Sequence, residues 1–109
     1  MKISEESIFD ALRTVIDPEL GIDIVSLGLI YDVSLYPVQT KSGTEQHVHI
    51  TMTLTTPGCP LAGVFDGMLR DSLKTIDGLD TQRQVQIELT FDPPWVPDMM
   101  SEDARAELF

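Results

Sequence analysis

Hydrophobic residues recur every three or four positions near the start of the chain, which is the spacing of an amphipathic helix. Ser4, ahead of them, can accept a hydrogen bond from a free backbone N–H of the first turn. The pattern predicts a helix from Ser4 to about residue 15. Asp17-Pro18 ends it, because a residue before proline is disfavoured in the α conformation, and residues 17–23 follow as an acidic loop. The stripe consists of Ile8, Ala11, Leu12 and Val15.

Two later segments alternate hydrophobic and polar residues with a period of two, which predicts strands over residues 29–36 and 47–55. The connection between them, residues 37–46, is polar and contains proline and glycine, so we expect a mobile segment without chemistry. The inward positions are Leu29, Tyr31, Val33 and Leu35 in the first strand and Val48, Ile50, Met52 and Leu54 in the second.

The only cysteine of the chain stands between the second strand and a second helical pattern. Pro60 suits the first position of a helix, which makes Cys59 the predicted N-cap of a helix over residues 61–76. Gly78 is the expected stop just past its end.

A third alternating segment, residues 84–91, predicts the last strand, with Val85, Ile87, Leu89 and Phe91 on one face. Pro93-Pro94-Trp95 ends it, since prolines cannot continue a ladder. Trp95 is either a packing anchor or an exposed recognition residue, and burial of large aromatics favours the anchor. Ser101 is predicted to cap a short terminal helix.

The order α-β-β-α-β-α predicts an α/β fold, a two-layer sandwich in which helices cover a small mixed three-stranded sheet, with residues 1–109 forming one domain. The first two strands form an antiparallel hairpin, and the intervening helix allows the third to lie parallel to the second. We therefore expect the acidic loop 17–23, the cysteine loop and the loop at 92–95 to converge at one side of the sheet.

The charge and the cysteine count restrict partners and location. A net charge of -11 repels nucleic acids and anionic lipids, so neither a nucleic-acid partner nor a membrane partner is expected. The chain has no long apolar run and no signal-peptide pattern, and its single cysteine cannot form an internal disulfide. These features predict a cytoplasmic protein.

Cys59 is the main candidate for chemistry. A cysteine at a helix N-cap is favoured as the thiolate, which is both a nucleophile and a soft metal ligand; the alternative is a small buried hydrophobe. His47 and His49 begin the strand that the cysteine follows, roughly 20 Å away, so no Cys–His pair is expected. The two histidines share one face and could bind a metal themselves, although two ligands alone make a weak site.

Polar residues of two loops could complete such a site. Asp17, Glu19 and Asp23 could supply oxygen ligands or a proton acceptor, or form an ordinary solvated acidic turn. The hydroxyls of Thr55 and Thr56 could hydrogen-bond a sulfur or an anion, or simply end a strand. The residues alone leave both alternatives open.

Three motifs in this order carry a family resemblance across nearly the whole chain: Asp17-Pro18-Glu19-Leu20-Gly21-Ile22-Asp23 continuing to Tyr31, Thr55-x-x-x-Cys59-Pro60, and Pro93-Pro94-Trp95 with Met100-Ser101. The chain resembles the small iron–sulfur assembly factors of the SufT, PaaD and eukaryotic cytosolic-assembly type. PaaD-type members carry extra cysteines near the C-terminus, which this chain lacks, so neither their zinc site nor a phenylacetate-pathway role is expected here.

The resemblance implies a small α/β domain whose members mature iron–sulfur proteins as adaptors or transient carriers rather than as enzymes. It implies that an iron–sulfur cluster or iron is held transiently, and that the partners are client iron–sulfur proteins and the assembly machinery. The implied functional patch, with Cys59 as the metal ligand, is Asp17, Glu19, Leu20, Thr55, Thr56 and Cys59.

The leading hypothesis is therefore a maturation factor acting through Cys59. A cluster usually takes four thiolates, so one cysteine must be complemented by another molecule, and a homodimer is one way to supply it. The alternatives are a thiol enzyme with Cys59 as nucleophile and a protein-binding adaptor in which Cys59 is structural.

Overall fold

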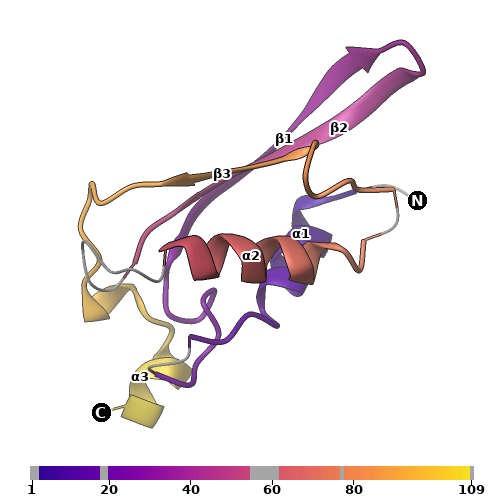
Figure 1. Ribbon diagram of the computed structural model, residues 1–109. Coiled ribbons are helices and arrows are strands. Elements are labelled where there is room, and N and C mark those ends of the chain that lie inside the picture. The colour runs from indigo at the N-terminus through magenta and orange to yellow at the C-terminus, as the bar shows by residue number, and fades with distance from the viewer. Residues whose placement is uncertain (1–2, 18–19, 55–61, 77, 109) are drawn as a thin grey trace.

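The structure is a computed structural model that describes residues 3–17, 20–54, 62–76 and 78–108. Its elements are, in order, α1 (Glu5–Leu12), β1 (Ile30–Thr40), β2 (Gly43–Met52), α2 (Ala62–Leu73), β3 (Val85–Leu89), the 3₁₀ helix η1 (Pro97–Met99) and α3 (Glu102–Leu108). Apart from η1, this is the predicted α-β-β-α-β-α order (Figure 1). None of the helices in the described ranges is long and apolar enough to cross a membrane.

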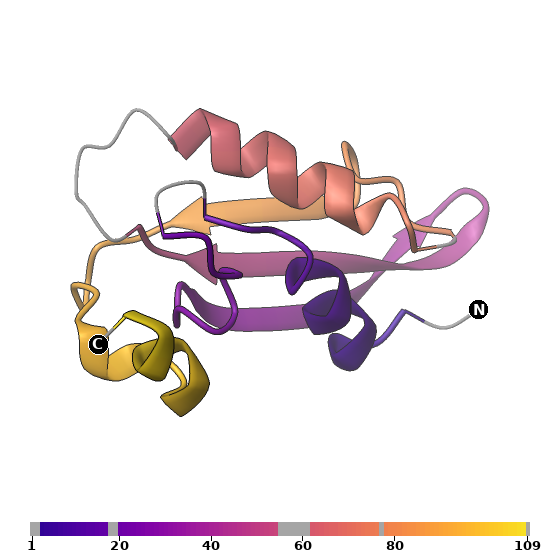
Figure 2. The ribbon, with the colours of Figure 1, turned by 90° about the horizontal axis from the view of Figure 1, so that it is seen from below.

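The sheet has the strand order β1-β2-β3, with β1 antiparallel and β3 parallel to β2. Ile30 at the start of β1 stands opposite Met52 at the end of β2, and Met52 stands opposite Leu89 at the end of β3. These three residues define what we call the strand-end side of the sheet, and their alignment confirms the predicted topology. Both α1 and α2 lie on one face of the sheet, as expected for a two-layer α/β sandwich (Figures 1 and 2).

The first helix begins where the sequence predicts. The Ser4 hydroxyl accepts a hydrogen bond from the backbone N–H of Ser7 (3.1 Å), and the Ser7 hydroxyl accepts one from the N–H of Ser4 (3.0 Å), a reciprocal cap. The helix ends at Leu12, earlier than predicted, because the Val15 N–H bonds to the carbonyl of Leu12 (3.0 Å) in a tighter turn. Val15 is nevertheless buried, so the hydrophobic stripe continues past the helix.

The prediction of a polar connection over residues 37–46 was wrong. β1 continues to Thr40 and β2 begins at Gly43, so only Lys41-Ser42 separates the two strands. This part of the hairpin projects beyond the helices (Figure 1), where neither side of the ladder is covered and no apolar alternation is required. Pro37 is tolerated because β1 is an edge strand of the sheet.

Two further differences arise at the strand-end side. The pairing of β1 with β2 shifts between Ile30 and Asp32, so Tyr31 is an extra residue and leaves the predicted inward stripe. β2 ends at Met52 rather than at residue 55, and Thr53, predicted to point outward, is fully buried. The predicted outward alternation therefore fails at the end of the strand.

The hydrophobic core lies between the two helices and the sheet. Burying one valine, leucine or isoleucine side chain stabilises a fold by about 1.5–3 kcal/mol, so this layer of aliphatic side chains is the main source of stability. Its fully buried members come from both helices, from β2 and from the loop before β1: Ile8, Leu12, Ile24, Leu27, Leu29, Val48, Ile50, Leu69 and Leu73.

The second helix agrees with its predicted course in the part that is described. α2 runs from Ala62 to Leu73, and the Ile76 N–H then donates to the carbonyl of Leu73 (3.0 Å) in a final turn. Gly78 has a φ of +82°, a conformation that glycine adopts readily after a helix. The predicted N-cap Cys59 lies outside the described residues.

Candidate functional site

Asp17 is a buried residue that organises the acidic loop. The residue is 4% exposed, and its Oδ1 accepts a hydrogen bond from the backbone N–H of Leu20 (3.1 Å). Its backbone pairs with Gly21 and Ile22, at 2.8 and 2.9 Å, which closes the loop on itself. The interpretation of this segment as a solvated acidic turn is therefore wrong for Asp17. Leu20, which follows in the same loop, is half-buried and packs against the core. Glu19, the other carboxylate of this motif, lies outside the described residues.

Asp23 occupies the second turn of the same loop. It forms an isolated antiparallel bridge with Ile16, and its Oδ2 accepts from the backbone N–H of Ser26 (3.0 Å). Beside it is a hollow of about 220 Å³, lined by Ile22, Asp23, Ser26, Asp103 and Ala104. Within the described ranges, no group of three or more His, Cys, Asp or Glu side chains could hold a metal ion. Asp17 and Asp23 each accept a hydrogen bond from a backbone N–H of the loop and so shape its turns.

Hydrogen bonds tie the three converging segments together at the strand-end side. The Thr53 N–H donates to the carbonyl of Leu29, and the Thr90 N–H donates to the carbonyl of Met52, both at 2.8 Å. The loop before β1, the chain leaving β2 and the chain leaving β3 are thus immediate neighbours. The start of α2 lies at this same end of the molecule in both views (Figures 1 and 2). The predicted site residues Thr55, Thr56 and Cys59 belong to the segment between Leu54 and Ala62, outside the described residues.

Thr53 has an unusual environment that the sequence does not signal. Its hydroxyl oxygen is fully buried and has no hydrogen-bond partner among the described residues. A buried hydroxyl without a partner costs about 1–3 kcal/mol, so such groups are rare in native structures. Periodicity places Thr53 on the solvent side of β2, and only the packing at the end of the strand reveals its burial.

The residues after β3 form a C-terminal strap, residues 93–101, that holds the first loop. The indole Nε1 of Trp95 donates to the carbonyl of Leu27 (2.7 Å), and the Ser101 N–H donates to the carbonyl of Ser26 (2.8 Å). Trp95 is half-buried against the core, which supports its interpretation as a packing anchor. Ser101 also caps α3, its hydroxyl accepting from the Ala104 N–H at 3.2 Å, as predicted.

The strap also approaches the start of β1. Gly28 has a φ of +79°, and a Cβ there would clash with the carbonyl oxygen of Met99, so no larger residue fits. The hydroxyl of Tyr31, at the bulge in β1, donates to the carbonyl of Pro93 (2.7 Å). Two of the three sequence motifs, the first loop and the Pro-Pro-Trp segment with Met100-Ser101, are thereby joined in one structural unit.

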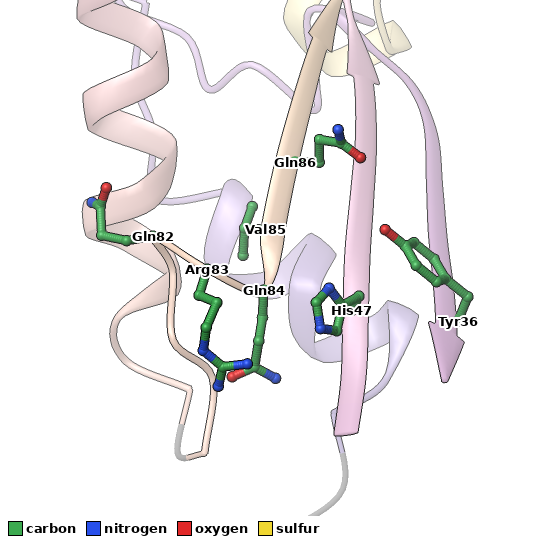
Figure 3. Close-up of a pocket in the computed structure, with 7 residues that line it drawn as sticks. All are labelled: Tyr36, His47, Gln82, Arg83, Gln84, Val85 and Gln86. Atoms are coloured by element: carbon green, nitrogen blue, oxygen red, sulfur yellow. The ribbon is translucent and has the colours of Figure 1, made fainter. Parts of the chain in front are cut away.

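The polar face of the sheet carries a second hollow, of about 320 Å³, beside the middle of β2 and the start of β3, away from the strand-end side (Figure 3). His47 Nε2 lies 3.0 Å from Glu45 Oε1, and the Arg83 guanidinium donates to the same oxygen. The hydrogen bond from Arg83, followed by that from His47, holds the pKa of Glu45 below its ordinary value of 4.5. The hollow is lined by Tyr36, His47, Gln82, Arg83, Gln84, Val85 and Gln86.

The two histidines lie on this polar face. His49 Nε2 lies 3.4 Å from Glu88 Oε1, so each ring faces a carboxylate of its own. The described residues around them include no third ligand that would complete a metal site.

The fold and the strand-end side define a class of protein, a small α/β domain in which the loop before β1 and the chain leaving β2 and β3 meet at one side of a three-stranded sheet. A family model described as "Iron-sulfur cluster assembly protein" matches residues 5–87. The chain belongs to this family of iron–sulfur cluster assembly proteins, which confirms the resemblance in its motifs.

Individual relatives are similar over nearly their whole length. An Fe-S protein maturation auxiliary factor of Porphyromonas gingivalis is 42% identical over 105 residues, which cover 96% of this chain and 90% of that protein. The Fe-S protein maturation auxiliary factor YitW of Bacillus subtilis is 39% identical over 104 residues, or 95% and 92% of the two chains. The crystal structure of a domain of unknown function, DUF59, from Bacillus anthracis superposes with a TM-score of 0.78 at 36% identity, covering 95% and 90%.

Proposed function

We propose that this protein is an iron–sulfur maturation factor that holds iron or an iron–sulfur cluster transiently through Cys59 and passes it to client proteins. Membership of the assembly family and the names of the similar proteins support this role. The observation that carries the proposal is the pair of hydrogen bonds at the strand-end side, Thr53 to Leu29 and Thr90 to Met52. They hold the loop before β1 and the chain leaving β3 beside the end of β2, from which the chain continues toward Cys59.

The proposed site combines Cys59 with Thr55, Thr56, Asp17, Glu19 and Leu20. Asp17 acts on the loop rather than on the cargo, since its Oδ1 accepts from the Leu20 N–H and its side chain is buried. Leu20, partly exposed, borders the site. The thiolate of Cys59 is the ligand to iron.

One thiolate leaves most coordination positions of a cluster to other molecules. A second copy of this chain, a small thiol or the client's own cysteines would fill them. Incomplete coordination suits a carrier, because the cargo leaves when a client supplies more ligands. Transfer of this kind needs no turnover chemistry, so the proposed role is that of an adaptor or carrier rather than an enzyme. A reducing cytoplasm would keep the single thiol available.

Anaerobic reconstitution with ferrous iron and sulfide tests the cargo role. Wild-type protein should develop visible sulfur-to-iron charge-transfer absorption and retain iron and sulfide after desalting, whereas Cys59→Ser should retain neither. Circular dichroism and the thermal midpoint of Cys59→Ser provide the control for folding. Light scattering of the reconstituted sample reports whether a cluster is shared between two copies.

Complementation tests the maturation role. The wild-type chain should restore iron–sulfur enzyme activities in a Bacillus subtilis strain that lacks its own relative, and Cys59→Ser should not. Full restoration by Cys59→Ser would overturn the carrier role and favour an adaptor in which the cysteine is structural.

A further inference from the structure

The hollow of about 320 Å³ beside the middle of β2 plays no part in the proposed function, because it lies away from the strand-end side. His47 precedes the buried Val48 and is the register partner of Tyr36, so both rings stand on the sheet face that α1 and α2 leave uncovered. Gln86 is the register partner of His49, two residues further along the same face. One side chain from each of three neighbouring strands therefore borders the hollow (Figure 3).

The charged groups at the hollow already pair with one another. Glu45 Oε1 accepts a hydrogen bond from the Arg83 guanidinium and lies 3.0 Å from His47 Nε2. Arg83 Nε also lies 3.7 Å from Asp80 Oδ2. An anionic ligand would have to compete with two carboxylates for Arg83, and a cationic ligand would meet the guanidinium itself. The hollow therefore favours an uncharged ligand.

One wall of the hollow is held in place by the turn that leads into β3. Gln84 is buried there, its Nε2 donating to the carbonyl of Gln46 (2.7 Å) and its Oε1 accepting from the N–H of Asp80 (2.8 Å). Asp80 Oδ1 in turn accepts from the N–H groups of Gln82 (3.0 Å) and Arg83 (3.2 Å). A wall fixed by these hydrogen bonds is ordered before a ligand arrives, which lowers the entropic cost of binding.

Neutral polar groups at the hollow remain available for a ligand. No hydrogen bond within the described ranges engages the hydroxyl of Tyr36 or the side-chain amide of Gln86. Nδ1 of His47 forms no hydrogen bond there either, since only Nε2 faces Glu45. A hydroxyl and an amide each offer both a donor and an acceptor. Their complement is a ligand that carries donors and acceptors along its edge.

The spacing of the strands and the two aromatic rings indicate the shape of this ligand. Tyr36 stands on β1 and Gln86 on β3, with β2 between them, so their backbones are roughly 10 Å apart, twice the distance between neighbouring strands. The ring centroids of Tyr36 and His47 lie 5.8 Å apart, with planes at 41°, and the Tyr36 residue is 38% exposed. Flat heterocyclic bases stack on exposed aromatic rings of this kind. The hollow is thus wide enough for one flat ring system beside Tyr36, with its polar edge toward Gln86.

We propose that this hollow binds the base of an uncharged adenine nucleoside. The Gln86 amide matches the edge of adenine, because its oxygen accepts from the exocyclic amino group while its nitrogen donates to the neighbouring ring nitrogen. Tyr36 supplies the ring on which the base stacks. A phosphate group would meet Glu45 and Asp80, so the ligand is a nucleoside rather than a nucleotide. The inference goes beyond the proposed function and does not involve Cys59.

Titration of the ¹⁵N-labelled full chain with adenosine, followed through the NMR chemical shifts of its backbone amides, tests the proposal. The shifts should saturate and should be largest around Tyr36, His47 and Gln86. Inosine, which has a carbonyl in place of the amino group, should bind at least about fivefold more weakly, the lower limit for losing a bidentate base contact. Adenosine monophosphate should bind more weakly than adenosine at low salt, where the repulsion of its phosphate is least screened.

The variants are Gln86→Leu, which removes the amide, and Tyr36→Leu, which removes the ring. Each should weaken the binding of adenosine at least about fivefold. Both positions are exposed, so the fold should be kept, and the spectrum without ligand reports whether it is. Gln46→Leu is the matched control and should bind as the wild type does, since Gln46 is an exposed glutamine of β2 that alternation with His47 puts on the opposite face of the sheet.

A titration in which adenosine causes no saturable shifts, or shifts centred away from the hollow, would overturn this inference. So would equal affinity of the wild type for adenosine and inosine, or an affinity for adenosine that Gln86→Leu leaves unchanged. Uptake of iron and sulfide is measured separately on reconstituted Gln86→Leu and should equal that of the wild type, so the nucleoside site and the carrier function stand or fall independently.

Discussion

The indole Nε1 of Trp95 donates a hydrogen bond to the carbonyl oxygen of Leu27 across 2.7 Å. The two residues are 68 positions apart in the chain, and Leu27 is fully buried. This contact fastens the C-terminal strap onto the loop that precedes β1. The Pro-Pro-Trp motif therefore has a structural role, which is to hold the first motif in place.

Trp95→Phe should lower the free energy of unfolding by about 1–3 kcal/mol, because it leaves the buried carbonyl of Leu27 without this partner while keeping an aromatic ring. Urea denaturation followed by circular dichroism measures the change, since Trp95 is the only tryptophan and its fluorescence is lost. Tyr31→Phe is the matched control: it removes the hydrogen bond to Pro93 in a more exposed position and should cost less. An equal loss in both variants would contradict the assigned role of Trp95.

Gly28→Ala should be strongly destabilising, by more than about 2 kcal/mol, since the new Cβ would combine left-handed strain with a clash against the backbone of Met99. Gly21→Ala provides the comparison, because Gly21 has a similar φ of +70° but no atom within 4 Å of the added Cβ. It should cost only about 1 kcal/mol, the strain alone. Thermal unfolding of both variants measures the difference, and equal midpoints would show that the strap yields to the added methyl group.

Thr53→Val should leave the protein as stable as the wild type or stabilise it by about 1 kcal/mol, because the methyl group replaces a buried hydroxyl that has no partner among the described residues. Thr53→Ser keeps the hydroxyl but loses the packed methyl group, so it should destabilise. Chemical denaturation measures the free energy of unfolding of the wild type, Thr53→Val and Thr53→Ser and so ranks them by stability. A Thr53→Val variant that is clearly less stable would mean that the hydroxyl is satisfied in solution.

The stability contribution of Glu45 should depend on pH. Arg83 and then His47 lower the folded-state pKa of Glu45 from its ordinary value of 4.5, so the native state binds fewer protons than the unfolded state near that pH. Its contribution is present above about pH 4.5 and is lost as the pH falls through the folded-state pKa.

Thermal midpoints of the wild type and Glu45→Gln between pH 3 and 7 measure this effect. The two proteins should differ most at neutral pH and converge in acid. In an Arg83→Gln background the difference at neutral pH should shrink, because the largest cause of the lowered pKa is gone. A difference in thermal midpoint that grows in acid would contradict a lowered pKa of Glu45 in the folded state.

The sequence alone was sufficient to predict the helices and strands that contact the core. Ser4 and its hydrophobic stripe predicted α1, and the alternation around Val48 and Ile50 predicted β2. A crossover helix between two strands implies that they are parallel, so the meeting of the loop before β1 with the chain leaving β2 and β3 also followed from the chain order. The family was recognisable from the motifs themselves.

Where burial does not follow periodicity, the sequence alone did not predict the extent of the strands or the exposure of their side chains. β1 continues to Thr40 and β2 begins at Gly43 although residues 37–46 do not alternate, because backbone pairing needs no core. Leu89 and Phe91 repeat the inward pattern of β3 yet remain exposed, because where the helical cover ends depends on the placement of α2.

What the sequence by itself determined is the order of elements, the core face of each and the family, since these depend on local spacing and on short motifs. Only the tertiary structure decided that Trp95 anchors the first loop, that Asp17 is buried and that the end of β3 is uncovered. Each of these depends on which distant residue lies opposite, and neither spacing nor composition along a chain specifies that.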